Sequence, residues 1–233
     1  MSALVELNNL TKSYGSGRPA VDSLNLTLES GRIIGLLGPN GSGKTTIIKM
    51  INGLLRPDKG EVLIEGRAPG PYTKSVISYL PERTYLEAGK TVADLLDFFE
   101  DFYTDFRPER AREMIRALGI DESARIKTLS KGTKEKVQLI LVMSRDAKLY
   151  ILDEPIAGVD PAARDYIIRT IIGNYNKDAS VLICTHLISD IEDILDEVIF
   201  LMKGHLVLRG TKEEIMAKYG VSVDKHFREV FKC

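Results

Sequence analysis

The chain has 233 residues, a formal net charge of −1, 44% hydrophobic residues and 28% charged residues. These values are typical of a globular protein with a sizeable core, and they argue against strong electrostatic attraction to nucleic acid or to a membrane surface. The cysteines, Cys184 and Cys233, do not make a disulfide framework, and no apolar run approaches the ~20 residues that cross a bilayer. Residues 1–6 lack the charged start and long apolar core of a signal peptide. We therefore expect a cytoplasmic protein with no nucleic-acid partner, which reaches a membrane only through another protein.

Short strands are predicted in the first eighty residues. Leu24, Leu26 and Leu28 alternate with polar residues, which is the period of a half-buried strand. Further β signals occupy residues 4–7, 61–66 and 76–80. We expect these segments to form an antiparallel β layer around a buried apolar strand at residues 33–37.

A glycine-rich loop follows that buried strand and precedes an apolar helix predicted at residues 47–51. The loop fits the phosphate-binding pattern of two glycines around four residues and then Lys and a hydroxyl. Its residues are Gly38, Pro39, Asn40, Gly41, Ser42, Gly43, Lys44, Thr45 and Thr46. Glycines let backbone N–H groups converge on phosphate oxygens, and the helix N-terminus adds partial positive charge. Lys44 would then reach the β- and γ-phosphates and the Thr45 hydroxyl would ligate Mg²⁺, unless the loop is an ordinary glycine-rich turn.

Residues 83–146 are predicted to form a helical insert. Apolar residues recur at helical spacing after Thr91, Pro108 and Gly119 bracket a second helix, and residues 131–145 form a third. The insert carries an aromatic cluster, which consists of Phe98, Phe99, Phe102, Tyr103 and Phe106. This cluster either packs on two sides of the helices or leaves an exposed apolar patch for a partner.

Strands and helices alternate again in the last third of the chain. Residues 149–152 and 181–184 are continuous apolar runs, as in strands buried on both faces of a parallel sheet. Asp160 and Pro161 favour a helix start between them. A hairpin at 198–201 and 205–208 and a capping box at Thr211 follow, and the tail from Val221 has no clear pattern.

An acidic pair, Asp153 and Glu154, ends the first of these buried strands. Ligands of open α/β sheets bind at the carboxyl ends of the strands. Asp153 is therefore a candidate for the Mg²⁺ shell, and Glu154 is a candidate to polarise a water that attacks the γ-phosphate. The alternative is an acidic first turn of a helix, which the following Pro155 and Gly158 disfavour.

Taken together, these motifs resemble those of the nucleotide-binding subunits of the ATP-binding cassette (ABC) transporter family. The phosphate loop, a signature-like segment at residues 129–134, the acidic pair, a loop ending at Asp160 and a histidine, His186, follow one another in the family's order. Tyr14 stands where the family places an aromatic that stacks on adenine. The resemblance implies an α/β fold with a P-loop NTPase core, a mostly parallel sheet, an antiparallel β subdomain and a helical insert.

The resemblance also implies a division of the chain and a set of partners. The whole of 1–233 would be one ABC ATPase domain, with a core at about 1–82 and 147–210, a helical subdomain at about 83–146 and a tail at 211–233. Two subunits would sandwich ATP and Mg²⁺ head to tail, as a homodimer or heterodimer, and the helical insert would contact an integral membrane permease.

Individual residues take roles in that arrangement. The resemblance implies that Ser130, Lys131 and Gly132 bind ATP held by the other subunit and that Asp160 belongs to the dimer loop. His186 would hold the attacking water, although a histidine after a strand is often only structural. Tyr14 would stack on the base, although it could equally pack its own loop.

Two departures from the family pattern concern the metal and the signature. Glu82 stands where the family usually has Gln, so it could ligate Mg²⁺ but could not donate a hydrogen bond. Lys131 and Thr133 replace the usual Gly and Gln. Lys131 could strengthen ATP capture through its charge or could point to solvent.

Three function classes fit the sequence. The first is the ATPase subunit of a transporter with a separate permease, and the Tyr-Leu-Pro-Glu and Leu-Ser-Lys-Gly variants favour an exporter type. The second is a soluble cassette ATPase of repair, translation or metal-cluster assembly, for which the tandem cassettes or long coiled-coil insertions are missing. The third is a regulatory cassette that holds ATP without hydrolysis, against which Glu154 and His186 argue.

Overall fold

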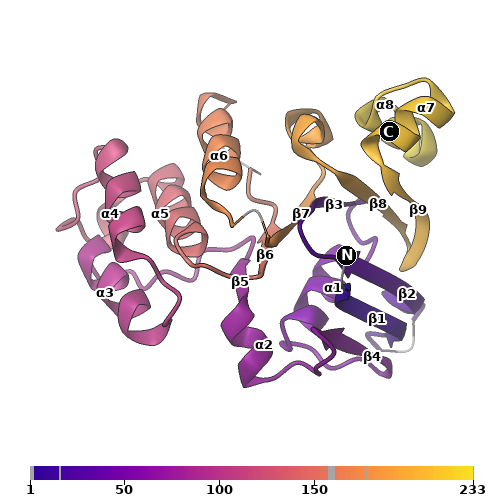
Figure 1. Ribbon diagram of the computed structural model, residues 1–233, viewed down its shortest axis with the longest axis horizontal. Coiled ribbons are helices and arrows are strands. Elements are labelled where there is room, and N and C mark those ends of the chain that lie inside the picture. The colour runs from indigo at the N-terminus through magenta and orange to yellow at the C-terminus, as the bar shows by residue number, and fades with distance from the viewer. Residues whose placement is uncertain (1–2, 16, 157–160, 177, 233) are drawn as a thin grey trace.

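The computed structural model describes residues 3–15, 17–156, 161–176 and 178–232. Within this part of the chain a six-stranded sheet has the strand order β5-β6-β7-β3-β8-β9 (Figure 1). Neighbouring strands are parallel except for β9, which is antiparallel to β8. Their bounds are β3 (Ile33–Leu37), β5 (Ile77–Leu80), β6 (Leu149–Asp153), β7 (Ser180–Thr185), β8 (Glu197–Met202) and β9 (His205–Thr211). The prediction of a mostly parallel sheet is confirmed.

A second, antiparallel sheet packs against the first. Its strand order is β2-β1-β4, with bounds β1 (Ala3–Lys12), β2 (Val21–Glu29) and β4 (Lys59–Ile64). The placement of residues 76–80 in this layer was wrong, because β5 pairs in parallel with β6 at the edge of the larger sheet. The reason is burial: Ile77 and Ser78, which point to opposite faces of the strand, are both covered.

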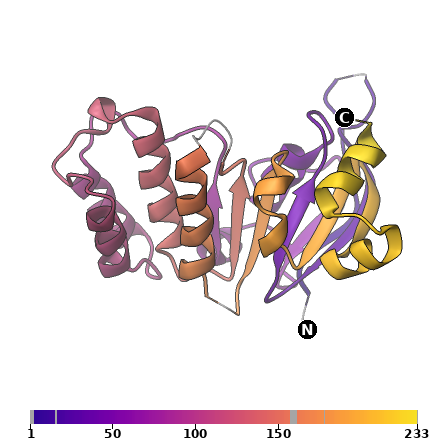
Figure 2. The ribbon, with the colours of Figure 1, turned by 90° about the horizontal axis from the view of Figure 1, so that it is seen from above.

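Eight α-helices connect or cover the strands within the described residues. Their bounds are α1 (Lys44–Ile51), α2 (Pro71–Val76), α3 (Val92–Phe102), α4 (Pro108–Ala117), α5 (Lys131–Met143), α6 (Pro161–Asn174), α7 (Lys212–Tyr219) and α8 (Val223–Phe231). Short 3₁₀ turns lie at Ile126–Thr128, Ile188–Asp190 and Glu192–Ile194. Figures 1 and 2 both place α3, α4 and α5 together at one end of the molecule and α7 and α8 at the other.

Three apolar clusters hold these layers together. One lies between the two sheets and α1, and one covers the other face of the larger sheet beneath α6 and α8. The third lies among α3, α4 and α5 and includes Leu96, Phe99, Ile115 and Ile140. This separate core supports the predicted division into a core and a helical insert, which remains a prediction.

The C-terminal tail contains a helix that the sequence analysis did not predict. Residues 223–231, for which the sequence analysis made no structural prediction, form α8 with Ser222 as the N-cap. Val223 and Phe227 are buried, and the Phe227 ring meets the Phe200 ring of β8 edge to face with centroids 5.3 Å apart. The apolar residues of α8 are four apart and thus lie on one helix face, which the high polar content of the tail obscures. None of the described helices is long and apolar enough to cross a bilayer.

Candidate functional site

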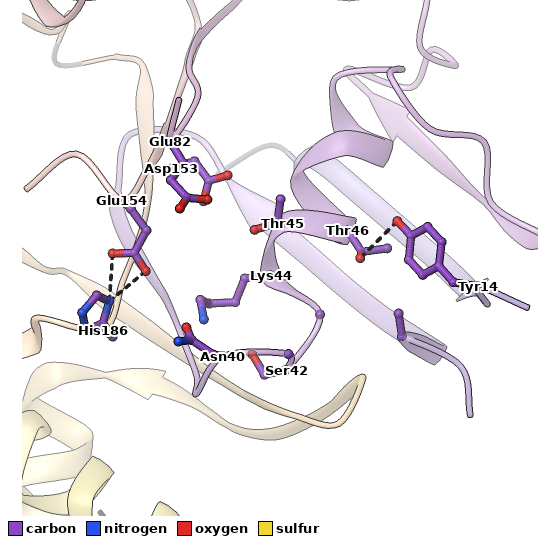
Figure 3. Close-up of a pocket in the computed structure, with 13 residues that line it drawn as sticks. Tyr14, Asn40, Ser42, Lys44, Thr45, Thr46, Glu82, Asp153, Glu154 and His186 are labelled. Carbon is purple, nitrogen blue, oxygen red and sulfur yellow. Dashed lines mark hydrogen bonds and ion pairs between the residues drawn. The ribbon is translucent and has the colours of Figure 1, made fainter. Parts of the chain in front are cut away.

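A cavity of about 420 Å³ opens at the carboxyl ends of β3, β6 and β7 (Figure 3). It is the place where the topology brings the predicted motifs together, because parallel strands end at the same edge of the sheet. Its lining residues are Tyr14, Ala20, Asn40, Gly41, Ser42, Gly43, Lys44, Thr45, Thr46, Glu82, Asp153, Glu154 and His186. Of these residues only Ala20 was missed by the sequence analysis, since a small apolar residue before a strand carries no chemical signal.

The loop between β3 and α1 has the tight geometry that only glycine permits at two positions. A Cβ atom at Gly38 would lie 2.5 Å from the carbonyl oxygen of Leu201. Gly43 has φ near 109°, and a Cβ there would lie 2.5 Å from the carbonyl oxygen of Ala20. The loop is thus packed closely against the backbone at Leu201 and Ala20, and its residues from Asn40 to Thr46 line the cavity at the start of α1.

Two side chains of this loop fit a phosphate ligand. Lys44 is 7% exposed, and its Nζ donates to the carbonyl oxygens of Gly38 at 2.6 Å and Pro39 at 3.2 Å. These bonds hold the ammonium group within the loop and facing the cavity. Ser42 is buried, and its Oγ has no hydrogen-bond partner among the described residues. Because a buried hydroxyl without a partner is costly, this orphaned atom indicates that a ligand completes the loop.

The acidic wall of the cavity consists of Glu82, Asp153 and Glu154. Asp153 is 3% exposed at the end of β6. Burial, and then the negative charges of Glu82 and Glu154, raise the pKa of Asp153 to about 6, while Lys44 and Lys49 oppose the rise. Oxygen atoms crowded in this way fit a hard divalent cation, which would relieve their repulsion.

Glu154 and His186 are in direct contact on one side of the cavity. The His186 Nδ1 atom lies 3.1 Å from both carboxylate oxygens of Glu154. The backbone of Glu154 has φ near 54°, a left-handed conformation that a non-glycine residue seldom adopts, and its N–H donates to the carbonyl oxygen of Cys184 at 2.7 Å. Such strain gathers at functional sites, and here it turns the Glu154 side chain toward the histidine and the loop.

Tyr14 lies at the open end of the cavity. Its ring is 57% exposed, and its hydroxyl is 3.5 Å from Thr46 Oγ1. An exposed aromatic ring beside a phosphate loop is free to stack on a base, so the structure fits that prediction without testing it.

The signature-like segment does not line this cavity. Ser130 is the exposed N-cap of α5, and its Oγ accepts from the N–H of Thr133 at 3.1 Å. Lys131 is exposed and lies 3.8 Å from Glu135. It also borders a second cavity, of about 500 Å³, whose lining residues include Glu82 and Glu154. Asp160 lies outside the described residues.

The aromatic cluster of the helical insert is divided between core and surface: part of it packs inside and part forms an exposed apolar patch, whose partner remains a prediction. Phe99 and Phe106 are buried, whereas Phe98 and Phe102 are 56% and 66% exposed. The exposed rings line a groove of about 400 Å³, which we call the aromatic groove. Its other lining residues are Asn52, Leu54, Lys74, Ile77, Ser78, Tyr79, Pro81, Tyr85, Phe99, Tyr103, Val142 and Arg145. The core side of this groove was not predicted, because its residues are far from α3 in the sequence.

Comparison with known proteins agrees with this geometry. Residues 21–157 match the family model described as ABC transporter. The chain is 33% identical over 210 residues to the SkfA peptide export ATP-binding protein SkfE of Bacillus subtilis, covering 88% of this chain and 87% of that protein. It is 32% identical over 225 residues to the lipopolysaccharide export system ATP-binding protein LptB of Haemophilus influenzae, covering 92% and 93%.

Solved structures give the same result. The chain is similar to an ATP-binding subunit of an ABC transporter, with a TM-score of 0.88, 28% identity and coverage of 98% and 99% of the two chains. A dimeric ATP-binding cassette bound to ADP and Pi shares the fold, with a TM-score of 0.77 and 21% identity over 89% of this chain and 98% of the other. These matches confirm the predicted fold class.

Proposed function

Because this chain belongs to the ABC transporter family and is one of its ATP-hydrolysing subunits, we propose that it drives export through a separate membrane permease. The cavity that brings the phosphate loop against Asp153, Glu154 and His186 is the observation that carries the proposal. The relatives named for peptide export and lipopolysaccharide export support an exporter type. Docking on a permease would place the subunit at the inner face of the cell membrane.

In this proposal the phosphate loop binds the triphosphate of ATP. Lys44 exchanges its bonds to the loop carbonyls for charge-assisted bonds to the β- and γ-phosphates, and Ser42 Oγ gains a partner. The other loop residues, except Pro39, which has no N–H, contribute backbone N–H groups, and Tyr14 stacks on adenine.

A Mg²⁺ ion would be held by the Thr45 hydroxyl and the carboxylates of Asp153 and Glu82. No group of three or more His, Cys, Asp or Glu side chains within the described ranges is arranged to hold a metal by itself. The phosphates and water must therefore complete the shell, as is usual for Mg²⁺. When bound, the ion neutralises charge on the transferred phosphoryl group.

Glu154 acts as the base toward the attacking water and His186 positions it. The carboxylate is only 13% exposed, while the histidine is half exposed and reaches the cavity from β7. The contact of Nδ1 with both carboxylate oxygens orients Glu154 toward the γ-phosphate position.

A second ATPase subunit completes the site. We place Ser130, Lys131 and Gly132 of that subunit on the γ-phosphate, and Asp160 in the loop that lines the dimer contact. The exposure of Ser130 at the N-terminus of the thirteen-residue α5 supports this placement, since a helix start with free surface suits a phosphate. Removal of the γ-phosphate would then let the subunits separate.

The aromatic groove is the proposed docking site of the permease. Leu54, Tyr85, Phe98 and Phe102 are between 49% and 66% exposed around one concave surface. Large aromatic rings around a groove are typical anchors for a short partner helix with an apolar face.

The test is co-expression with the membrane protein encoded beside this chain, followed by purification from detergent and reconstitution into liposomes. We expect a stable complex whose ATP hydrolysis requires Lys44 and Glu154. Phe102→Ala should weaken complex formation, whereas Met216→Ala, at an exposed apolar position on α7, should not. Hydrolysis without any membrane partner in the pull-down would contradict the transport role, and a stable complex without hydrolysis would indicate a regulatory cassette.

A further inference from the structure

One buried arginine, Arg145, lines the aromatic groove, and all three of its guanidinium nitrogens donate hydrogen bonds. Its Nε and Nη2 atoms each donate to one carboxylate oxygen of Asp105 at 3.0 Å. Nη1 donates to the carbonyl oxygen of Ile77 and Nη2 to that of Ser75, both at 2.7 Å. The guanidinium carbon also lies 3.9 Å from the centre of the Tyr103 ring. Only arginine can meet a carboxylate, two carbonyls and a ring at once.

These contacts join the helical insert to the core of the protein. Asp105 and Tyr103 lie just after α3, and Ser75 and Ile77 lie where α2 passes into β5. The backbone near Arg145 adds to the junction, because the N–H of Asp146 donates to the carbonyl oxygen of Asp105 at 2.8 Å. The Tyr150 hydroxyl of β6 donates to the carbonyl oxygen of Arg145 itself. The side chain of Arg145 is 3% exposed, so this junction is shielded from water and is costly to break.

Three of the joined elements lead to the proposed nucleotide site. β5 runs from Ile77 toward Glu82, which follows the strand by two residues. β6 runs from Tyr150 to Asp153 and Glu154. α5, which ends just before Arg145, begins at the Ser130 N-cap. A displacement of Arg145 would therefore be transmitted through β5 to Glu82, through β6 to Asp153 and Glu154, and through α5 to its N-terminus.

The same arginine is accessible to an occupant of the groove through its neighbours. Arg145 and Tyr103 line the groove, and the Tyr103 ring is in edge contact with Phe102, with ring centroids 4.9 Å apart. A partner that displaces the exposed Phe102 ring would thus displace the Tyr103 ring and, through it, the guanidinium group.

We propose that Arg145 is the positioning residue through which a permease helix seated in the aromatic groove sets the positions of Glu82 and the acidic pair. This inference rests on the proposed function. Coupling between two sites is reciprocal, so a ligand at the phosphate loop must also change the groove, whether or not the permease is present. That reciprocity allows the inference to be tested on the purified chain alone.

The experiment measures amide hydrogen exchange of residues 99–106 with and without Mg²⁺ and a non-hydrolysable ATP analogue. In the parent chain we expect the analogue to slow exchange in this segment. Arg145→Lys keeps the charge but cannot form the two-nitrogen contact with the Asp105 carboxylate. In this variant we expect the slowing of exchange by the analogue to be smaller by about fivefold or more. Asp105→Asn is a milder change of the same contact, and it decides the matter if Arg145→Lys does not fold. Arg107→Lys is the matched control, because Arg107 is paired with Asp146 at 2.6 Å but its side chain is 55% exposed.

The outcomes separate the inference from the proposed function. An unchanged response of residues 99–106 in folded Arg145→Lys or Asp105→Asn would overturn the inference and leave a structural role only. Loss of the response in these variants but not in Arg107→Lys would support it. In the reconstituted complex the permease should no longer stimulate ATP hydrolysis by these variants, although the variants should still bind the permease with the same affinity. Absence of any permease complex in the parent chain would refute the proposed function instead.

Discussion

His186 and Glu154 come from the ends of adjacent strands, and the histidine Nδ1 lies 3.1 Å from both carboxylate oxygens of the glutamate. Glu154 holds this position with a left-handed backbone conformation at φ near 54°. The pair faces the phosphate loop across the cavity, as Figure 3 shows. A carboxylate that is held by a strained backbone and aligned by an imidazole is the arrangement expected of a base that acts on a bound water.

Glu154→Gln should abolish most hydrolysis while ATP binding persists. The amide cannot accept the proton of the water, so phosphate release by the assembled complex should fall by about 10²-fold or more. ATP affinity, measured with a fluorescent analogue, should stay nearly constant, and ATP should trap a dimer that is visible in sedimentation. Rapid turnover by this variant would show that another group is the base.

Lys44→Ala should weaken ATP binding. A lost charge-assisted contact costs about 1.5–3 kcal/mol, which corresponds to a drop in affinity of tenfold or more. Lys49→Ala is the control, because Lys49 lies on the same helix but is exposed on its surface. Equal affinities of the two variants for the analogue would remove Lys44 from the phosphate site.

Lys131→Ala should weaken ATP-driven dimerisation if its exposed ammonium group meets the partner's phosphates. The loss should be a few-fold and should shrink at high salt, because an exposed charge is screened. Lys218→Ala on α7, at the opposite end of the molecule in Figure 1, should leave dimerisation unchanged. Unchanged dimerisation of Lys131→Ala across several ATP concentrations would mean that this side chain points to solvent.

The raised pKa of Asp153 predicts that the stability of the nucleotide-free protein depends on pH. Its pKa rises from 3.8 to about 6 on folding, so the folded state holds the proton to higher pH than the unfolded state does. Stability should therefore fall as the pH rises from about 4 to about 6, and the full cost, about 3 kcal/mol at most, should persist at neutral pH.

Asp153→Asn should remove this cost. In urea titrations without nucleotide and with a chelator, the variant should be the more stable protein near pH 7.5. Its advantage should shrink as the pH falls and disappear below about pH 3, where the Asp153 carboxyl group is protonated in both the folded and the unfolded state. A constant difference between the two proteins over this range would contradict the raised pKa.

Phe227→Ala tests whether α8 is part of the fold. The ring is 7% exposed and contacts Phe200 and Phe231, with centroids 5.3 Å and 4.4 Å away. Its removal should lower the free energy of unfolding by about 3–5 kcal/mol. Phe102→Ala removes an equally large but exposed ring and should change stability little. Similar urea midpoints for both variants would indicate that α8 does not contribute to the core.

The sequence alone determined the local chemistry of this protein. The phosphate loop, the acidic pair and the buried strands are contiguous segments, whose residue types and spacing follow from backbone geometry and from the needs of a phosphate ligand. For the same reason the sequence indicated the parallel core, the helical insert and the capping box at Thr211, which forms between Thr211 and Glu214.

The tertiary structure decided what depends on long-range pairing. Whether β5 joined the parallel or the antiparallel sheet was set by its partner, β6, which lies about seventy residues away. Distant residues also meet in the contact of His186 with Glu154 and in the contact of the Arg145 guanidinium group with Asp105. The raised pKa of Asp153 likewise depends on residues far away in the sequence. Local patterns carry no information about such contacts, because burial and neighbouring charge exist only after the chain has folded.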